Sequence, residues 1–498
     1  MTADVKAEIV AFLTERLGGA QRVDTHISTV LLGRDRVFKI KRPVRLPYLD
    51  FSTRDLRLQM CEREVALNRR FAPALYLGMR RVAREADGRL ALDGGGDLVE
   101  AFVEMRRFPD DALFERMARE GRLTRDMTER LARRVAAAHD AAAADTARGG
   151  AASMREIIDS MEASFHAATP APLSEIEAHL DNLRRVLDEK AALLDERRAQ
   201  GCVRACHGDL NLRNVCLFEG EPTPFDCIEF SDDISTIDVL YDIAFLLMDL
   251  WRVGLSDLAN LMLNRYLDAR IQSEEEGLPL LPFFMALRAT IRAHVEGAQG
   301  HVEVSRDYFE LSRALLLPAG RNVVAIGGFS GAGKSSVAAA LAPLVGPAPG
   351  ARIFNSDRIR KRLFGAAPTD RLPPEAYRSE ASEKVYRSMF DAAERVARTG
   401  WPVIVDAVFD RAPDRAAIEA VASAAGAPFL GAWLDLDLSQ RIARVDKRTN
   451  DVSDATRDVL QAQAAKETGE IDWMRIDAGR KAREIAREIV AALPPPKS

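Results

Sequence analysis

Two domains are predicted for this chain: an α+β domain over residues 1–317 and an α/β domain with a parallel sheet over residues 321–498. The chain has 498 residues, too many for a single hydrophobic core at roughly 150 residues per domain. In the first part, short β-like runs precede a long stretch with helical spacing of apolar residues. In the last part, apolar runs alternate with helical stretches, a pattern typical of parallel sheets. Pro318 and Gly320 mark the expected joint between the domains.

The composition is that of an ordinary globular protein, with 47% hydrophobic and 29% charged residues. These proportions exclude a wholly disordered chain, a collagen-like repeat and a small disulfide scaffold. The formal net charge of −5 provides no overall cationic field for nucleic acid or an anionic membrane. Such partners are therefore not favoured, and no motif specifies an oligomeric state.

Cysteine usage and hydropathy favour a cytoplasmic protein. There are five cysteines, an odd number that is typical of a reducing compartment. Cys202, Cys206 and His207 could suggest a metal site, but no second ligand pair follows at zinc-finger spacing, so we expect buried thiols. The most apolar run, residues 239–250, is interrupted by Asp242 and Asp249, so no membrane span is predicted.

In the first domain, β-strands are expected at residues 28–32, 36–41 and 98–105, with one helix at 56–71. From residue 123 to about 317 the apolar spacing is mostly helical, except for a polar, β-like passage at 203–230. The Ala-rich run 136–153 is interpreted as a helix end followed by a surface connection.

The polar passage at 203–230 contains the residues most suited to chemistry. Transfer of a phosphoryl group to a hydroxyl needs a carboxylate that orients the hydroxyl, and oxygen ligands that hold Mg²⁺. Asp209 suits the first role, and Asn214 and Asp226 suit the metal role. His207 is expected to brace the loop. The alternative is that Asp209 caps a helix and Asp226 merely ends a strand.

The segment His207-Gly-Asp-Leu-Asn-Leu-Arg-Asn214, with the downstream Asp226, resembles the catalytic loop and metal-binding acid of the aminoglycoside phosphotransferase and choline kinase-like superfamily. The order of a sheet-rich lobe and a helical lobe fits the same two-lobed, protein-kinase-like fold. This resemblance implies that Lys39 binds the nucleotide phosphates and that Glu64 pairs with it. Lys41 and Glu62 are the runners-up, and a solvated strand face is the alternative for both lysines.

The resemblance extends to a bacterial family of fused proteins, described as aminoglycoside phosphotransferase-like plus ATP-binding kinase, over nearly the whole chain. It is carried by segments 25–28, 49–53, 67–73 and 225–230. This sequence departs from the pattern at Asn211, where relatives commonly carry His, and lacks a Gly-rich loop in the first hairpin, where only Gly33 is present. Residues 25–28 are expected to cover the phosphates instead. Residues 102–106 are expected to bind the base, and Asp242 to support the catalytic loop.

The second domain opens with a short apolar strand that leads directly into Gly-x-x-x-x-Gly-Lys-Ser and an Ala-rich helix. In this context the glycines let backbone N–H groups surround the phosphates of a nucleoside triphosphate, and the helix N-terminus adds positive potential. Lys334 is expected to reach the terminal phosphates and Ser335 to bind Mg²⁺. The nucleotide-binding residues are predicted to be Gly328, Ser330, Gly331, Ala332, Gly333, Lys334, Ser335 and Ser336.

Further charged residues follow the later strands of this domain. Asp357 ends the second strand, with Arg360 three residues on, and Asp406 ends the third in the form of a Walker B carboxylate. The segment resembles small P-loop kinases of the gluconate kinase and polynucleotide 5′-kinase type. That resemblance implies that Asp357 activates the acceptor hydroxyl and Arg360 holds substrate. A helix N-cap is the alternative for Asp357.

The fourth strand of the second domain is followed by Arg444 and Arg448, which lie one helical turn apart. At this position a lid arginine would neutralise charge on the transferred phosphoryl group. The alternative is a solvated helix face.

The leading hypothesis is a bifunctional phosphotransferase with two sites for ATP and Mg²⁺, which acts on hydroxyl groups of small molecules. A polynucleotide 5′-hydroxyl kinase in the P-loop half is the first alternative, suggested by the Asp357 and Arg360 pair. A regulatory ATP-binding switch without transfer is the second, suggested by the missing Gly-rich loop.

Overall fold

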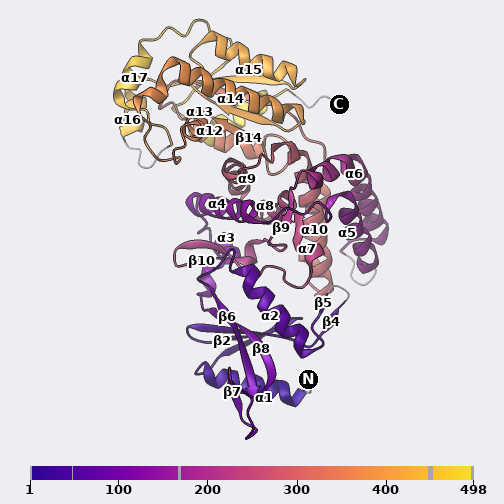
Figure 1. Ribbon diagram of the computed structural model, residues 1–498. Coiled ribbons are helices and arrows are strands. Elements are labelled where there is room, and N and C mark those ends of the chain that lie inside the picture. The colour runs from indigo at the N-terminus through magenta and orange to yellow at the C-terminus, as the bar shows by residue number, and fades with distance from the viewer. Residues whose placement is uncertain (1–2, 47–48, 166–169, 447–451, 495–498) are drawn as a thin grey trace. The chain divides into compact units, whose positions relative to one another are not determined.

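The computed structural model describes residues 3–46, 49–165, 170–446 and 452–494 (Figure 1). The chain forms two compact units: the first consists of Met1–Val253 with Ala269–Gln272, and the second of Gly254–Asp268 with Ser273–Ser498. The division after Val253 places helices before residue 317 in the second unit, whereas the sequence pattern put the domain boundary near residue 317. That boundary stays a prediction. No helix of the described ranges is long and apolar enough to cross a membrane.

The first unit begins with an antiparallel six-stranded sheet in the order β1-β2-β3-β8-β6-β7. One face packs against α1 (Ala3–Arg16) through Ile9 and Leu13, and the other against α2 (Arg54–Asn68) through Cys61 and Val65. Successive side chains of a strand point to opposite faces of the sheet, so the two helices contact different residues of each central strand. The strands are β1 (Gln21–Asp24), β2 (Ser28–Leu32), β3 (Arg36–Lys41), β6 (Tyr76–Arg84), β7 (Leu90–Leu92) and β8 (Asp97–Arg106).

On β3, Phe38 and Ile40 pack with the residues of α1, and Val37 packs with those of α2. Lys39 and Lys41 follow Val37 at intervals of two residues, so all three lie on the face of the sheet that α2 covers. The alternation of side chains along β3 thus places two lysines beneath a helix. The short strands β4 (Arg45–Leu46) and β5 (Leu49–Asp50) lead from β3 to α2.

The rest of the first unit is helical, as predicted, with short strands at the polar passage. Helix α4 ends at Ala141 and α5 begins at Gly150, so the Ala-rich run does contain a helix end and a connection. The helices are α3 (Phe114–Arg119), α4 (Arg125–Ala141), α5 (Gly150–Phe165), α6 (Leu173–Ala199), α7 (Asp232–Ser235) and α8 (Val239–Arg252). The strands are β9 (Val203–Ala205), β10 (Val215–Phe218), β11 (Glu221–Pro224) and β12 (Thr236–Asp238).

The second unit contains a parallel five-stranded sheet in the order β14-β15-β13-β16-β17, which confirms the predicted α/β fold. Every residue of the central strand β13 is buried, as expected for a parallel strand covered on both faces. The strand β17, which precedes the last helix, was not predicted. The strands are β13 (Val323–Gly327), β14 (Arg352–Asn355), β15 (Val403–Asp406), β16 (Phe429–Asp435) and β17 (Met474–Asp477).

Helices complete the second unit, and several of them pack against its sheet (Figure 1). Helices α12 and α18 pack together on the cluster that includes Val324, Ile326 and Ile489, while α14 packs against β15 and α15. The helices are α9 (Ser256–Ala269), α10 (Leu281–Ala298), α11 (Val302–Leu315), α12 (Lys334–Leu341), α13 (Ser356–Leu363), α14 (Ser379–Arg398), α15 (Ala412–Ala424), α16 (Leu438–Asp446), α17 (Arg457–Ala464) and α18 (Ala482–Ala492).

Helix α9 is tied to the sheet by buried amides and an ion pair. Asn264 accepts the backbone N–H of Ile353 at 2.8 Å and donates to the carbonyl of Ala351 at 3.2 Å. The fully buried Arg352 donates to Asn264 Oδ1 at 3.1 Å and pairs with Asp268 at 2.8 Å and Glu275 at 3.1 Å. These contacts position the start of β14, the strand that leads to Asp357.

We predict that Asn264→Ala destabilises the second unit by about 2 kcal/mol or more, because it removes the partner of the Ile353 N–H and one of the hydrogen bonds of the buried Arg352. Three of the four tryptophans, Trp401, Trp433 and Trp473, lie in this unit, so fluorescence-monitored urea unfolding measures the loss. Asp257→Asn on the exposed side of α9 is the control and should change the midpoint little. Equal midpoints for parent and Asn264→Ala would contradict the prediction.

Candidate active sites

In the first unit, Lys39 lies between Glu64, its predicted partner, and Asp226, the predicted metal ligand. Its Nζ donates to Glu64 Oε1 at 2.8 Å and to Asp226 Oδ1 at 2.5 Å. β3 provides the lysine, α2 the glutamate, and the segment after β11 the aspartate. The runner-up Lys41 is also buried and shares Glu64, with Nζ 2.7 Å from Oε2. The two lysines therefore do not form a solvated strand face.

The charges of this cluster stabilise one another. Burial lowers the pKa of Lys39, but the carboxylates of Asp226 and Glu64 outweigh it and hold that pKa well above its ordinary value. Burial raises the pKa of Glu64, yet the two lysines outweigh it and bring that pKa down to about 2. Lys39 and Glu64 are thus charged at neutral pH, and the charged form of a lysine is the one that donates to phosphate.

The catalytic loop places Asp209 beside Asn214. Asn214 Nδ2 donates to Asp209 Oδ2 at 2.7 Å and to the Asp209 carbonyl at 2.9 Å, and Asn211 Nδ2 donates to Asp209 Oδ1 at 3.0 Å. Asn211 thus orients the predicted base, at the position where the sequence departs from the family pattern. Since the amide nitrogen of Asn214 is engaged by Asp209, its amide oxygen is the atom suited to a cation.

His207 joins the catalytic loop to the Asp226 segment, as a bracing residue would. Nδ1 accepts the Asp209 N–H at 3.3 Å, which leaves the proton on Nε2, and Nε2 donates to the Phe225 carbonyl at 2.9 Å. Burial lowers the pKa of His207, so the imidazole is neutral. Phe225 N also donates to the Asn214 carbonyl at 2.9 Å.

Asp242 of α8 binds the backbone at the start of the catalytic loop. Its carboxylate accepts the Gly208 N–H at 2.8 Å and the His207 N–H at 3.3 Å, and it lies 3.1 Å from His139 Nε2. Cys206 approaches the same group, but burial raises the pKa of its thiol well above the ordinary value. Because the Asp242 carboxylate accepts two N–H groups of the catalytic loop, we interpret this cluster as support for the loop.

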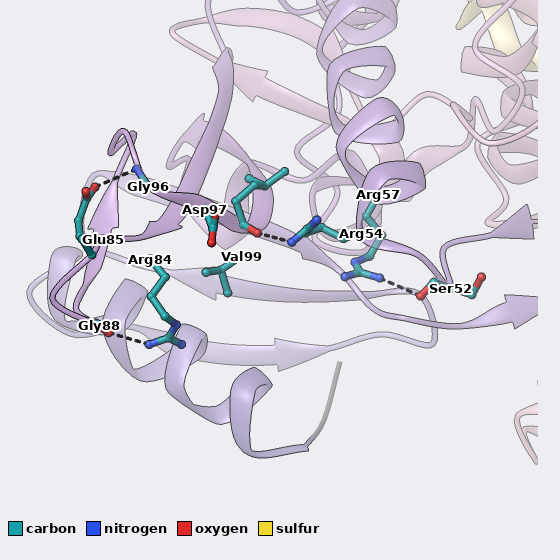
Figure 2. A pocket seen from close by; sticks show the side chains of 11 residues that line it. Ser52, Arg54, Arg57, Arg84, Glu85, Gly88, Gly96, Asp97 and Val99 are labelled. Atoms are coloured by element: carbon teal, nitrogen blue, oxygen red, sulfur yellow. Dashed lines mark hydrogen bonds between the residues drawn. The ribbon is translucent and has the colours of Figure 1, made fainter.

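A hollow of about 840 Å³ elsewhere in the first unit lies between the start of α2 and the β6–β7 hairpin (Figure 2). Its arginines are engaged by the protein: Arg57 by Glu100, Arg54 by the Leu98 carbonyl, and Arg84 by Glu8. The described lining residues include none of those predicted for the nucleotide site.

In the second unit, the P-loop connects the end of β13 to α12, as predicted. Gly333 has a φ of +98° and caps α12, and Gly328 has a φ of +135°. A Cβ on Gly328 would lie 2.7 Å from the Leu434 carbonyl oxygen, so both conformation and space require glycine there. Lys334 begins α12, and its Nζ donates to the Phe329 carbonyl at 3.3 Å. The loop backbone is thus shaped for an anion at the helix N-terminus.

The predicted magnesium residues of this unit are in direct contact. Ser335 Oγ donates to Asp406 Oδ2 at 2.6 Å, and Asn355 Nδ2 donates to the same oxygen at 2.6 Å. Because β13 and β15 are parallel neighbours, the residues at their carboxyl ends meet at one edge of the sheet. A hydroxyl and a carboxylate are oxygen donors of the kind that Mg²⁺ prefers, so this donor set fits the ion.

Asp357 faces the same edge, within electrostatic range of Lys334 and Asp406. Burial is the main cause that raises its pKa, with Asp406 adding to the effect, while Lys334 and a hydrogen bond from Ser453 oppose it. The side chain that caps α13 is Asn355, whose Oδ1 accepts the Arg358 N–H, so the N-cap alternative for Asp357 is wrong. A carboxylate of raised pKa suits a general base.

The predicted arginines bind the protein itself. Arg360 Nη1 donates to the Ala376 carbonyl at 2.5 Å, and its guanidinium lies 4.9 Å from the centre of the Tyr377 ring. Arg444 donates to the carbonyls of Ala332 at 3.0 Å and Ala478 at 2.7 Å, so it contacts the P-loop backbone. Arg448 lies outside the described residues.

Some contacts of the second site carry no motif that the sequence reasoning used. Gln463 of α17 accepts the Ser330 N–H at 2.9 Å and donates to Ser330 Oγ at 3.1 Å. Asp454 pairs with the buried Lys361 at 3.1 Å and accepts the Tyr377 hydroxyl at 2.5 Å. One stretch of chain, 452–463, therefore contacts both the P-loop and the surroundings of Asp357.

Two protein-family models match this sequence, one in each of the two parts that carry a candidate site. Residues 55–279 match the family model described as the phosphotransferase enzyme family, and residues 323–468 match the one described as an AAA domain. The chain joins a phosphotransferase-family domain to an AAA-type P-loop domain. It is an enzyme of the ATP-dependent phosphotransferase class, and the family resemblance of the sequence is confirmed.

Similar proteins include relatives that cover most of the chain and solved structures that cover one part of it. Uncharacterized proteins of Mycobacterium tuberculosis and Mycobacterium bovis are 28% identical over 483 residues, which covers 93% of this chain and 93% of each relative. Among solved structures, a choline/ethanolamine kinase family protein from Mesorhizobium loti covers 63% of this chain and 95% of its own, at 15% identity and a TM-score of 0.40. The Mycobacterium tuberculosis APS kinase in complex with AMPPNP and APS covers 35% and 98%, at 22% identity and a TM-score of 0.28.

We predict that Asp357→Asn abolishes transfer at the P-loop site but stabilises the protein at neutral pH. Because the folded-state pKa of Asp357 lies above its unfolded value, folding is penalised as the pH rises from the unfolded pKa, about 3.9, through the folded one. The uncharged amide escapes this penalty. A melting temperature higher by about 2 °C at pH 7, with no gain near pH 3.5, is expected by scanning fluorimetry.

Asp391→Asn, at an exposed acid on α14, is the matched control and should leave the melting temperature unchanged at both values of pH. A lower melting temperature of Asp357→Asn at pH 7 would contradict the stated direction.

We also predict that Gln463→Ala weakens MgATP binding at the P-loop site about three- to tenfold, because the loop loses two hydrogen bonds that order it before the nucleotide arrives. Isothermal titration with MgATP in an Asp226→Ala background isolates this site. Gln461→Ala, at an exposed glutamine on the same helix, is the control. Equal affinity of the two variants would show that Gln463 does not order the loop.

Proposed function

We propose that this chain is a bifunctional phosphotransferase, with a separate site for ATP and Mg²⁺ in each unit, and that both sites transfer the γ-phosphoryl group to hydroxyls of small molecules. The observation that carries the proposal is the gathering of a complete set of phosphate-handling groups in each unit. Each set contains a lysine, a candidate base and oxygen donors for Mg²⁺. A chain that only binds nucleotide would not require a base in either set.

In the first unit, Lys39 would hold the nucleotide phosphates, while Asp226 and the Asn214 amide oxygen would hold Mg²⁺. Bound Mg²⁺ supplies charge neutralisation for the transferred phosphoryl group. Asp209, oriented by amide hydrogen bonds from Asn211 at 3.0 Å and Asn214 at 2.7 Å, would align the acceptor hydroxyl and take its proton.

In the second unit, the P-loop N–H groups and Lys334 would hold the phosphates, and Ser335 and Asp406 would hold Mg²⁺. Asp357, across the sheet edge from Lys334, would receive the acceptor proton. Its pKa is raised above that of an exposed aspartate, so the Asp357 carboxylate binds a proton more readily, which favours proton transfer. Arg444, bound to the Ala332 carbonyl, would hold the P-loop in shape.

Small-molecule acceptors are favoured over a polynucleotide. The net charge of −5 does not attract nucleic acid, and Arg360, which a 5′-kinase would direct at substrate, donates instead to the Ala376 carbonyl. Failure to label any 5′-hydroxyl oligonucleotide is therefore expected.

The regulatory alternative rests on the first unit's lack of a Gly-rich loop. A pure switch needs nucleotide binding, yet it needs neither Asp209 nor the amides that orient it. Transfer of phosphate to any acceptor through the first site would exclude the switch for that unit.

We predict that Asp209→Asn and Lys334→Ala abolish different reactions. With γ-labelled ATP and a fractionated metabolite extract, each variant should lose one set of labelled products by at least a hundredfold and keep the other, because each removes a group that acts in one site only. Asn182→Asp and Lys190→Ala, at helix α6, are the matched controls and should keep both sets. Retention of every product in both active-site variants would reject the proposal.

A further inference from the structure

Beside Lys39, the first unit contains a buried lysine, Lys41, which the proposed phosphate chemistry does not use. Its side chain is 1% exposed. Nζ donates to Glu64 Oε2 at 2.7 Å and to Glu229 Oε1, and it lies 4.9 Å from the centre of the Phe51 ring. Burial of a lysine costs folding free energy unless its charge is paired. Here two carboxylates and an aromatic ring surround one ammonium group and offset that cost.

Lys41 extends the Lys39 cluster into a network of alternating charge, in the order Asp226, Lys39, Glu64, Lys41 and Glu229. Glu64 is the centre of this ion-pair network, because each of its oxygens faces a different lysine: Oε1 lies 2.8 Å from Lys39 and Oε2 lies 2.7 Å from Lys41. A carboxylate held at both oxygens cannot rotate without breaking an ion pair. Lys41 therefore fixes the oxygen that Lys39 uses.

Glu229 connects the same network to the segment that carries Asp226. Residues of β6, α2 and β3 hold this segment at three positions. Asp226 N donates to the Tyr76 hydroxyl at 3.1 Å, Cys227 N donates to Asn68 Oδ1 at 2.9 Å, and Glu229 accepts from Lys41. Asp226 has a φ of +64°, a conformation that costs energy for a residue with a Cβ. The three anchors hold it there.

The network places three carboxyl groups against two ammonium groups, and Asp226 shares Lys39 with Glu64. A divalent cation at Asp226 would compete with Lys39 for that carboxylate, and Lys39 would then be released to donate to phosphate. Glu64 would keep Lys39 in place during this exchange only if it stayed in place itself, and Lys41 provides that restraint.

We propose that Lys41 and Glu229 are positioning residues of the first nucleotide site. They hold Glu64 and the Asp226 segment in place, so that Lys39 and Asp226 are already correctly positioned when MgATP binds. This inference rests on the function proposed for the first unit. It assigns roles to two residues outside the lysine, glutamate and aspartate that the family resemblance implies.

The test measures how nucleotide binding depends on Mg²⁺, a readout that a merely structural role would not move. The full chain carries Lys334→Ala to silence the P-loop site, and the probe is trinitrophenyl-ATP, titrated by fluorescence over a series of MgCl₂ concentrations. We expect Lys41→Met and Glu229→Gln each to raise the Mg²⁺ concentration for half-maximal binding at least fivefold, because Asp226 is no longer preset.

The double variant Lys41→Met with Glu229→Gln separates positioning from stability. It removes one buried positive and one buried negative charge, so its melting temperature should lie closer to that of the parent than the melting temperature of Lys41→Met does. Its Mg²⁺ requirement should remain at least fivefold raised. A double variant with parental Mg²⁺ dependence would overturn the proposal, since it would show that the pair only balances charge.

Two reference variants complete the design. Arg36→Met, at the exposed start of the same strand, should bind as the parent does. Lys39→Ala should weaken probe binding at least tenfold. If Lys39→Ala binds like the parent, the proposed nucleotide site itself fails. If Lys39→Ala is impaired while folded Lys41→Met and Glu229→Gln variants show parental Mg²⁺ dependence, the positioning proposal alone fails.

Should Lys41→Met not fold, Glu229→Gln decides the question, because it leaves Lys41 paired with Glu64. An unchanged Mg²⁺ requirement in Glu229→Gln would then overturn the inference.

Discussion

A buried charge is stable only where opposite charges or hydrogen-bond donors surround it, and both units of this chain are organised around that constraint. Phosphoryl transfer needs carboxylates and lysines close together and partly shielded from water. In the first unit the fully buried Glu64 meets this need between Lys39 and Lys41. In the second, the buried Asp406 accepts from Ser335 and Asn355.

The surrounding fold supplies the partners from distant parts of the sequence. The first cluster combines β3, α2 and the segment after β11, which lie up to 188 residues apart in the Lys41 and Glu229 pair. The second combines the carboxyl ends of three neighbouring parallel strands, where loops and helix N-termini converge. The two units thus reach the same electrostatic result from an antiparallel sheet with a helix across it and from a parallel sheet edge.

Three residues show where side-chain roles diverge from their motifs. Arg360 and Arg444, which occupy positions suited to substrate or phosphate, donate to backbone carbonyls and stabilise the loops around the second site. Asn211, a departure from the family pattern, orients Asp209 by an amide hydrogen bond. The partner atoms of the two arginines are backbone carbonyl oxygens, and no motif records them.

Local sequence was sufficient for the fold class, the P-loop and the set of candidate residues, because strand and helix periodicity, glycine conformation and motif spacing act over a few neighbouring residues. It also placed Lys39 and Lys41 on one face of β3. It did not reveal that α2 buries that face, that Glu64 bridges both lysines, or that Gln463 contacts Ser330. It also did not predict β17, or that α9 packs on β14. These features depend on contacts between segments far apart in the chain, whose energies arise only when the units fold and exclude water from the charges between them.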